Sequence, residues 1–110
     1  MNIIILKGRL TRDPEINYTQ SGKAVCSFDI AYNQTKEKVF FFNCQAWEKT
    51  AENITKYFKK GNEILFQGEL IQTTWEKEGK KQSRIIINVT RFDFIGLPKE
   101  KTESNQNPWR

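Results

Sequence analysis

The sequence predicts an all-β protein: one small barrel of five strands with a single helix. Three observations support this prediction. β-branched and aromatic residues dominate residues 1–97, and turn signals recur among them. Residues 24–32 alternate between apolar and polar side chains, as in a half-buried strand. Only one stretch, which starts near residue 50, has the spacing of an amphipathic helix. The length of 110 residues suits one domain.

The first two strands are bounded by turns. We expect the first strand over residues 2–10, and it would end at residues 11–14 because Pro14 cannot donate a ladder hydrogen bond. A second turn is expected at residues 21–22, Ser-Gly. The second strand, residues 24–32, would place five side chains on one face: Ala24, Cys26, Phe28, Ile30 and Tyr32.

The third strand, residues 39–47, follows a short polar loop over residues 33–38. Its alternation predicts an apolar set that faces the core: Phe40, Phe42, Cys44 and Ala46. The opposite set mixes aromatic and polar side chains: Phe41, Asn43, Gln45 and Trp47. We therefore expect Phe41 and Trp47 to be exposed, about 20 Å apart, where their rings could stack on unpaired bases. A loop, another strand or a second subunit could instead cover either ring.

One helix is expected next, with Thr50 as its N-cap. Three apolar side chains at i, i+3 and i+7 would form its buried face: Ala51, Ile54 and Phe58. Lys59 and Lys60 would lie in the last turn, where the helix dipole favours cations. Gly61 would then supply the left-handed residue that ends the helix.

A fourth strand is expected over residues 63–74 and a fifth over residues 83–95, joined by a charged turn over residues 76–81. Five strands with one helix between the third and fourth are the chain order of the OB-fold, a Greek-key barrel. That fold binds oligonucleotides or oligosaccharides, but the fold alone does not assign a ligand. We expect the domain to cover residues 1–97. Residues 98–110 lack apolar patterning and are expected to form a short disordered tail.

Trp75 is expected to close the fourth strand at the base of the hairpin, and it has three lysines near it in the sequence: Lys77, Lys80 and Lys81. An aromatic ring beside ammonium groups suits a stacked base with flanking phosphates. Trp75 could instead only shield the hairpin. Four other basic side chains could bind phosphates or be ordinary solvated charges: Arg9, Arg12, Lys49 and Lys60.

Composition narrows the function classes. The net charge of +5, with a pI of about 9.3, favours a polyanionic partner, either a nucleic acid or an anionic surface. Histidine is absent, and Cys26 and Cys44 form no CxxC pair, so His-dependent catalysis and a zinc site are not expected. No metal-binding or nucleotide-binding motif occurs, and we expect no enzyme activity and no cofactor. No apolar run reaches about 18 residues, so no membrane span is expected.

Six segments of the chain resemble bacterial-type single-stranded DNA-binding proteins. They are residues 8–15 (Gly-Arg-Leu-Thr-Arg-Asp-Pro-Glu), 18–25 (Tyr-Thr-x-Ser-Gly-x-Ala-Val), 28–33 (Phe-x-Ile-Ala-x-Asn), 47–52 (Trp-x-Lys-x-Ala-Glu), 57–61 (Tyr-x-x-Lys-Gly) and 68–70 (Gly-x-Leu). The resemblance implies an OB-fold that binds single-stranded DNA with little sequence preference in replication, recombination and repair. It also implies a cytoplasmic, nucleoid-associated homo-oligomer, usually a tetramer. The family's stacking aromatics correspond to Phe41, Trp47 and Trp75, and its basic positions to Lys49 and Lys60.

Three features depart from the family. The loop over residues 34–38 is short and has no aromatic residue, so one stacking contact is expected to be missing or displaced. Asn43 occupies a position that is basic in the family. Residues 98–110 lack the family's acidic tip, so recruitment of replication partners through that tip is not expected.

Other functions stay open at this point. An RNA-binding or primosome-type OB-fold protein would share the aromatic surface but bind a different ligand. A metal-dependent nuclease is disfavoured by the absence of histidine and of a carboxylate cluster. A purely structural role would make the exposed aromatics part of an interface between subunits.

Overall fold

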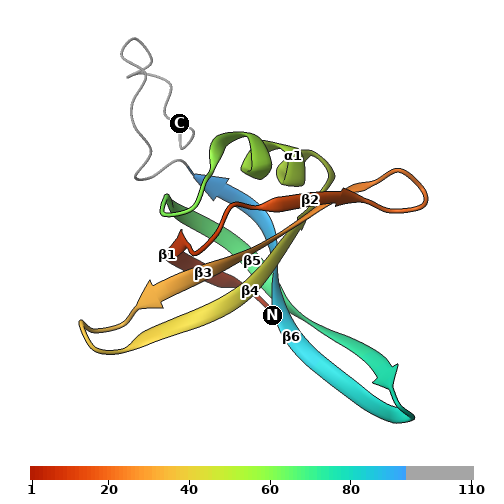
Figure 1. Ribbon diagram of the computed structural model, residues 1–110. Helices are drawn as coiled ribbons and strands as arrows, with labels where there is room; N and C mark the ends of the chain where they lie inside the picture. Colours follow the sequence, from red (N-terminus) through yellow and green to blue (C-terminus); the bar gives the residue numbers. More distant parts are fainter. Residues whose placement is uncertain (94–110) are drawn as a thin grey trace.

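The computed structural model describes residues 1–93, with six strands and one helix (Figure 1). In chain order they are β1 (Ile4–Leu10), β2 (Glu15–Tyr18), β3 (Ala24–Asn33), β4 (Val39–Trp47), α1 (Glu48–Tyr57), β5 (Glu63–Lys77) and β6 (Lys80–Asp93). The predicted tail, residues 98–110, lies outside the described residues, as do residues 94–97 of the predicted domain.

Five of these strands close into a barrel. Their order is β1-β5-β6-β4-β3, and β1 pairs with β3 as well as with β5, which joins the two edges of the sheet. Neighbouring strands are antiparallel except β4 and β6, which pair in parallel at Cys44 with Ile87 and at Gln45 with Asn88. Helix α1 connects the third and fourth strands of the barrel. The prediction of a five-stranded Greek-key barrel with one helix in that place is confirmed.

The short strand β2 was not predicted. It pairs with the first residues of β3, from Glu15 opposite Ser27 to Tyr18 opposite Ala24, and extends the sheet beyond the closed ring. The strand has only four residues, and Ile16 is its one aliphatic side chain. So short a segment has no period-2 pattern that sequence analysis could detect.

The core fills the barrel between its wall and the helix. Its largest fully buried side chains include Phe28, Phe58 and Phe66. Ala51, Ile54 and Phe58 are all buried, as the helical spacing predicted, and α1 packs mainly against β3 and β4 (Figure 1). Phe58 also meets Phe92 of β6 edge to face, with ring centroids 5.4 Å apart.

The ends of the helix differ from the prediction. The helix starts at Glu48 rather than after Thr50, and Trp47 is its N-cap without a side-chain hydrogen bond. It ends at Tyr57, so Lys59 and Lys60 follow the helix instead of lying in its last turn. Gly61 has the expected positive φ of 89°, but within the turn that leads to β5. There its N–H donates to the carbonyl oxygen of Leu10 at 2.8 Å, so this turn is held by the barrel wall.

The β5–β6 hairpin is longer than predicted and projects beyond the barrel (Figure 1). Trp75 therefore lies inside β5 instead of at its end, and the turn contains only Glu78 and Gly79, both with positive φ. The register shifts once, between Gln67 and Gly68. A side chain at Gly68 would collide with the carbonyl oxygen of Asn88, so the close approach of the strands there requires glycine.

The prediction that Phe40 faces the core was wrong. Phe40 is 43% exposed and stacks on Tyr32, with ring centroids 6.4 Å apart. The pairing between β4 and β6 is confined to Cys44 and Gln45, so the earlier residues of β4 pair only with β3. This end of the β3–β4 hairpin extends past the barrel (Figure 1), and among residues 1–93 only β3 pairs with residues 39–43 of β4.

Candidate nucleic-acid interface

The outer side of the barrel wall runs continuously from β4 through β6 to β5. Gln45 of β4 lies opposite Asn88 of β6, and Asn88 lies opposite Glu69 of β5. Asn88 Nδ2 donates a hydrogen bond to Glu69 Oε2 at 3.3 Å, so these two side chains are on the same side. Cys44 and Ala46, which flank Gln45, are buried. Gln45, Asn88 and Glu69 therefore point outward.

Strand alternation extends this outer side to three aromatic residues. Phe41 and Trp47 are an even number of residues from Gln45, and Trp75 is an even number from Glu69. The register shift of the hairpin lies before Glu69 and does not change this count. We call the outer surface defined by Phe41, Trp47 and Trp75 the aromatic face. Their exposed fractions are 68%, 38% and 44%, so the predicted exposure of Phe41 and Trp47 is confirmed.

Trp47 lies where β4 turns into α1, opposite Val25 of β3. Lys49 follows two residues later, in the first turn of the helix, and its side chain is exposed. The turn from strand to helix requires a φ of 56° at Glu48, in the left-handed region. This tight turn therefore lies between the exposed indole of Trp47 and the ammonium group of Lys49.

Trp75 lies on the projecting hairpin, opposite Gln82. The guanidinium carbon of Arg84 is 6.0 Å from the centre of the indole ring. Arg84 was not among the residues that the sequence predicted to contact nucleic acid. A signal was present, because an antiparallel hairpin with a turn near residue 78 brings Arg84 close to Trp75, but the exact turn position was not predicted.

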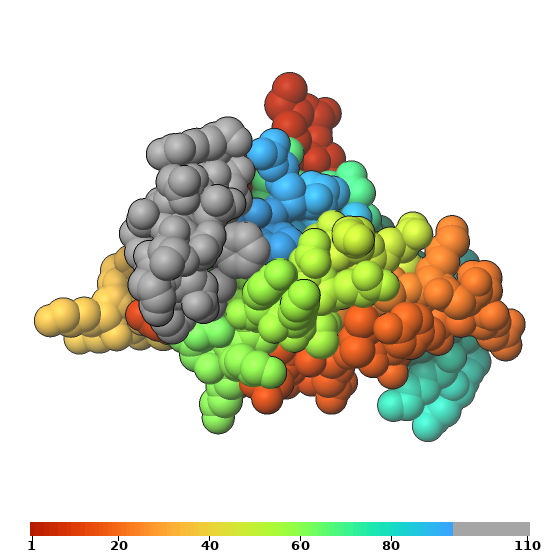
Figure 2. Space-filling view, turned by 90° about the horizontal axis from the view of Figure 1, so that it is seen from above, coloured from red at the N-terminus to blue at the C-terminus, as the bar shows by residue number. Residues whose placement is uncertain are grey.

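Lysines surround the tip of the same hairpin. Lys77 lies opposite Lys80 across the two-residue turn, and Lys81 lies opposite Glu76. All three lysines are exposed. Figure 2 shows this hairpin and the loop between β3 and β4 on opposite sides of the molecule.

Arg9 lies in one row with Phe41. Arg9 of β1 is opposite Ala31 of β3, and Ala31 is opposite Phe41 of β4, so only a methyl side chain separates the cation from the ring. Two strand spacings amount to about 10 Å. Arg9 Nη1 also donates to the carbonyl oxygen of Gly61 at 3.1 Å. The exposed Lys60 directly precedes Gly61, so it lies near the row that contains Arg9 and Phe41.

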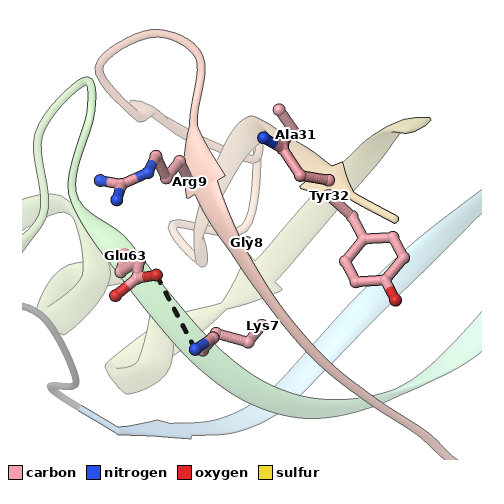
Figure 3. Close-up of a pocket in the computed structure, with 7 residues that line it drawn as sticks. Lys7, Gly8, Arg9, Ala31, Tyr32 and Glu63 are labelled. Atoms are coloured by element: carbon pink, nitrogen blue, oxygen red, sulfur yellow. Dashed lines mark ion pairs between the residues drawn. The ribbon is translucent and has the colours of Figure 1, made fainter. Parts of the chain in front are cut away.

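A pocket of about 230 Å³ opens where β1 separates from β3 (Figure 3). Its lining comes from β1, from the end of β3 and from the start of β5: Lys7, Gly8, Arg9, Ala31, Tyr32, Asn33 and Glu63. Lys7 Nζ is 3.9 Å from Glu63 Oε2, and Figure 3 shows the Arg9 side chain on the same side of β1 as Glu63. Arg9 thus lines a polar depression beside the Phe41 row.

Arg12 has two carboxylate partners. Its Nε donates to Asp29 Oδ2 at 3.1 Å, and its Nη1 lies 3.5 Å from Glu15 Oε1. The hydrogen bond and the charge of Asp29 raise the pKa of the Arg12 guanidinium, with a smaller contribution from Glu15. Asp29 Oδ1 also accepts a hydrogen bond of 2.7 Å from Asn43 Nδ2. Among the cations predicted to contact nucleic acid, Arg12 is therefore ion-paired at the edge of the aromatic face.

The described part of the chain has few side chains that could act in catalysis or bind a metal ion. Cys26 and Cys44 are buried free thiols, and burial raises the pKa of both. Within residues 1–93 no three His, Cys, Asp or Glu side chains gather around a point that could hold a metal ion. The same residues contain no helix long and apolar enough to cross a membrane.

Comparisons with known proteins agree with this geometry. The family model described as single-strand binding protein family matches residues 1–95. A single-stranded DNA-binding protein of Treponema pallidum is 38% identical over 87% of this chain and 58% of its own length. One of Fusobacterium nucleatum is 41% identical over 86% of this chain and 66% of its own length. The chain thus spans about three-fifths of the length of these relatives.

A solved structure shares the fold. It is a deletion mutant of the single-stranded DNA binding protein from Thermus aquaticus, and it matches with a TM-score of 0.72 and 31% sequence identity. The match covers 91% of this chain and 42% of that chain.

Proposed function

Because the chain belongs to the single-strand binding protein family, we propose that it binds single-stranded DNA without sequence preference and protects it during replication, recombination and repair. The observation that carries the proposal is the strand register, which puts three exposed aromatic rings on one outer face. The proposed role is binding without catalysis, in the cytoplasm at the nucleoid.

Base stacking supplies the attraction that favours single strands. Phe41, Trp47 and Trp75 each offer a ring on which a base can stack, for about 1–3 kcal/mol per base. Every base has a π-face, so stacking tolerates any sequence. Duplex DNA already stacks its bases internally and cannot offer them to these rings. The same surface therefore distinguishes single-stranded from duplex DNA without recognising the base sequence.

Phosphate contacts supply the rest of the affinity. The proposed cations are exposed side chains near the aromatic face or at the hairpin tip: Arg9, Lys49, Lys60, Lys77, Lys80 and Lys81. Neutralising phosphates releases counterions, so affinity falls with salt, with a slope of about −0.7 per phosphate for single strands. Arg12 is the remaining predicted cation, and its carboxylate partners set it apart from these six.

Exposed apolar residues support a homo-oligomer, which we propose to be a tetramer. They lie on β1, β4, β5 and β6 and at the N-terminus: Met1, Ile3, Ile5, Phe40, Leu70 and Ile85. Asn2 holds the N-terminal segment beside β5 through two hydrogen bonds with the backbone of Leu70, at 2.8 and 2.9 Å. Burial of such a surface against further copies favours association, and several copies would let one strand wrap around the assembly. Light scattering should give about four times the 13.0 kDa of one chain.

A titration with oligo-dT, followed by intrinsic tryptophan fluorescence at low and high salt, tests the proposed function. We expect strong quenching by oligo-dT and almost none by duplex DNA of the same length. Binding without quenching would contradict stacking on Trp47 and Trp75, and a preference for oligo-U would favour an RNA-binding protein. Absence of binding to all three ligands would overturn the proposal. Cleavage of labelled DNA in the presence of Mg²⁺ would contradict a role without catalysis.

A further inference from the structure

Asp29 lies between the two β4 aromatics on the outer side of the sheet. It is opposite Asn43, while Ala31 is opposite Phe41 and Val25 is opposite Trp47. Both carboxylate oxygens of Asp29 are engaged. Oδ1 accepts from Asn43 Nδ2 at 2.7 Å, and Oδ2 accepts from Arg12 Nε at 3.1 Å. The Asp29 side chain is 29% exposed, so this network is within reach of a ligand on the surface.

The charge around Arg12 is negative overall. One guanidinium lies between the carboxylates of Asp29 and Glu15, 3.1 and 3.5 Å away, which leaves a local net charge of −1. A phosphate that approached Arg12 would have to displace a carboxylate or be repelled by two of them. Arg9 differs, because its partner is the uncharged carbonyl oxygen of Gly61. Arg9 and Arg12 therefore differ in their availability to phosphates.

We propose that Asp29 withholds Arg12 from the phosphates of bound single-stranded DNA. The strand then crosses this part of the aromatic face with its bases over Asp29 and Asn43, and its phosphates follow the cations outside this network. This inference rests on the proposed function, which it deepens by assigning the path of the backbone. Asp29 acts here as a positioning residue, since it works through Arg12 and not by stacking or by neutralising charge on the DNA.

The hydrogen bond between Asn43 and Asp29 also decides which polar groups are left to contact a base. Asn43 uses one amide N–H on Asp29, so its carbonyl oxygen and its second N–H are left for a base edge. A lysine or arginine at position 43 would attract phosphate to the same place. This chain instead has the amide of Asn43 bonded to the carboxylate of Asp29. That pair carries no positive charge and therefore favours bases over phosphates at this point of the path.

The substitution Asp29→Asn tests the inference, because it removes the charge and keeps the size of the side chain. We expect oligo-dT affinity at about 50 mM salt to rise about three- to fivefold. The rise should be small, because the exposed ion pair that Arg12 exchanges for a phosphate contact is itself weak. The plot of log affinity against log salt should become steeper by about 0.7, the value of one added phosphate. Arg12→Ala should leave the wild-type slope unchanged, and in the Asp29→Asn background it should cancel the gain.

A matched control removes one carboxylate elsewhere. Glu37→Gln changes the same charge in the exposed loop between β3 and β4, and we expect no change of slope. Two results would overturn the inference: an unchanged slope in Asp29→Asn, or a wild-type slope that Arg12→Ala lowers by one phosphate. The second result is decisive even if Asp29→Asn were to unfold. Loss of all binding by the wild-type chain would instead contradict the proposed function.

Discussion

Trp75 and Arg84 lie diagonally across the β5–β6 hairpin, with the guanidinium carbon 6.0 Å from the centre of the indole ring. Trp75 is opposite Gln82 and Arg84 is opposite Thr73, so both side chains are on the side of the hairpin that carries the aromatic face. A guanidinium at this distance attracts the ring electrostatically. The contact can hold one side of the indole while a base uses the other, and it brings a cation to the phosphate of that base.

Replacing Arg84 should therefore affect both stacking and charge. For Arg84→Ala we expect a three- to tenfold loss of oligo-dT affinity and a salt slope reduced by about 0.7. The emission of Trp75 should change in the free protein, because the indole loses its neighbour. Lys23→Ala, in the exposed turn between β2 and β3, removes the same charge as a control. An effect no larger than that of Lys23→Ala would refute a role for Arg84.

The aromatic rings should matter more than any single lysine. Trp47→Ala and Trp75→Ala should each weaken oligo-dT binding by about 1–3 kcal/mol, because each removes one stacking platform. Fluorescence anisotropy of labelled oligo-dT measures this loss. The matched variants Trp47→Phe and Trp75→Phe should retain most of the affinity. Losses equal to or smaller than those of Lys49→Ala or Lys80→Ala would contradict the stacking assignment.

The turn of the β5–β6 hairpin offers a gain in stability. Glu78 has a φ of 54° and Gly79 a φ of 80°, which is the pattern of a type I′ turn. Asparagine tolerates the left-handed region better than glutamate, so Glu78→Asn should raise the free energy of unfolding by about 0.5–1 kcal/mol. Urea denaturation measures the change. Glu78→Gln removes the same charge without this benefit, and an equal gain in both variants would contradict the turn argument.

The buried thiols predict a loss of stability in alkali. Burial raises the pKa of Cys26 and of Cys44 above the usual 9.0, so both thiols stay protonated in the folded chain when the unfolded chain loses its thiol protons. The folded state then binds more protons. The free energy of unfolding should therefore fall as the pH rises above about 9, and this contribution is fully present below it. Urea denaturation from pH 7 to pH 10.5 measures the trend.

A double variant isolates the thiols from lysine and tyrosine, which also titrate near pH 10. Cys26→Ala combined with Cys44→Ala should be less stable at pH 7 and should show a flatter pH dependence. A thiol reagent should react slowly with the native wild-type chain and rapidly in urea. A flat pH profile in the wild type, or rapid native labelling, would contradict the burial argument.

Much of the fold follows from local patterns. The alternation in residues 24–32 and 39–47 predicted two strands, and the spacing of Ala51, Ile54 and Phe58 predicted the face that α1 buries. These patterns report which side chains avoid water, and each is contained within one element. The predicted helix boundaries were less accurate. Helix α1 begins at Glu48, before Thr50, with no side-chain hydrogen bond at its N-cap, and it ends at Tyr57, before Lys59.

In the candidate site, too, some features were predictable from local patterns and others were not. The exposure of Phe41 and Trp47 was predictable from the alternation within β4, because both rings share a face with the polar side chains of Asn43 and Gln45. Phe40 has the same alternation as Cys44 but is exposed, because the barrel wall ends before it. No local pattern reports where a wall ends.

The sequence by itself determined the type of five strands and the helix and the buried side of most of them, because alternation and helical spacing are properties of contiguous segments. Only the tertiary structure decided that Trp75 shares a face with Trp47, through the pairing of β4, β6 and β5. It also decided that Arg12 meets Asp29, 17 residues away. Such contacts depend on the register between distant strands, and a shift of one residue would turn each side chain to the other side of the sheet.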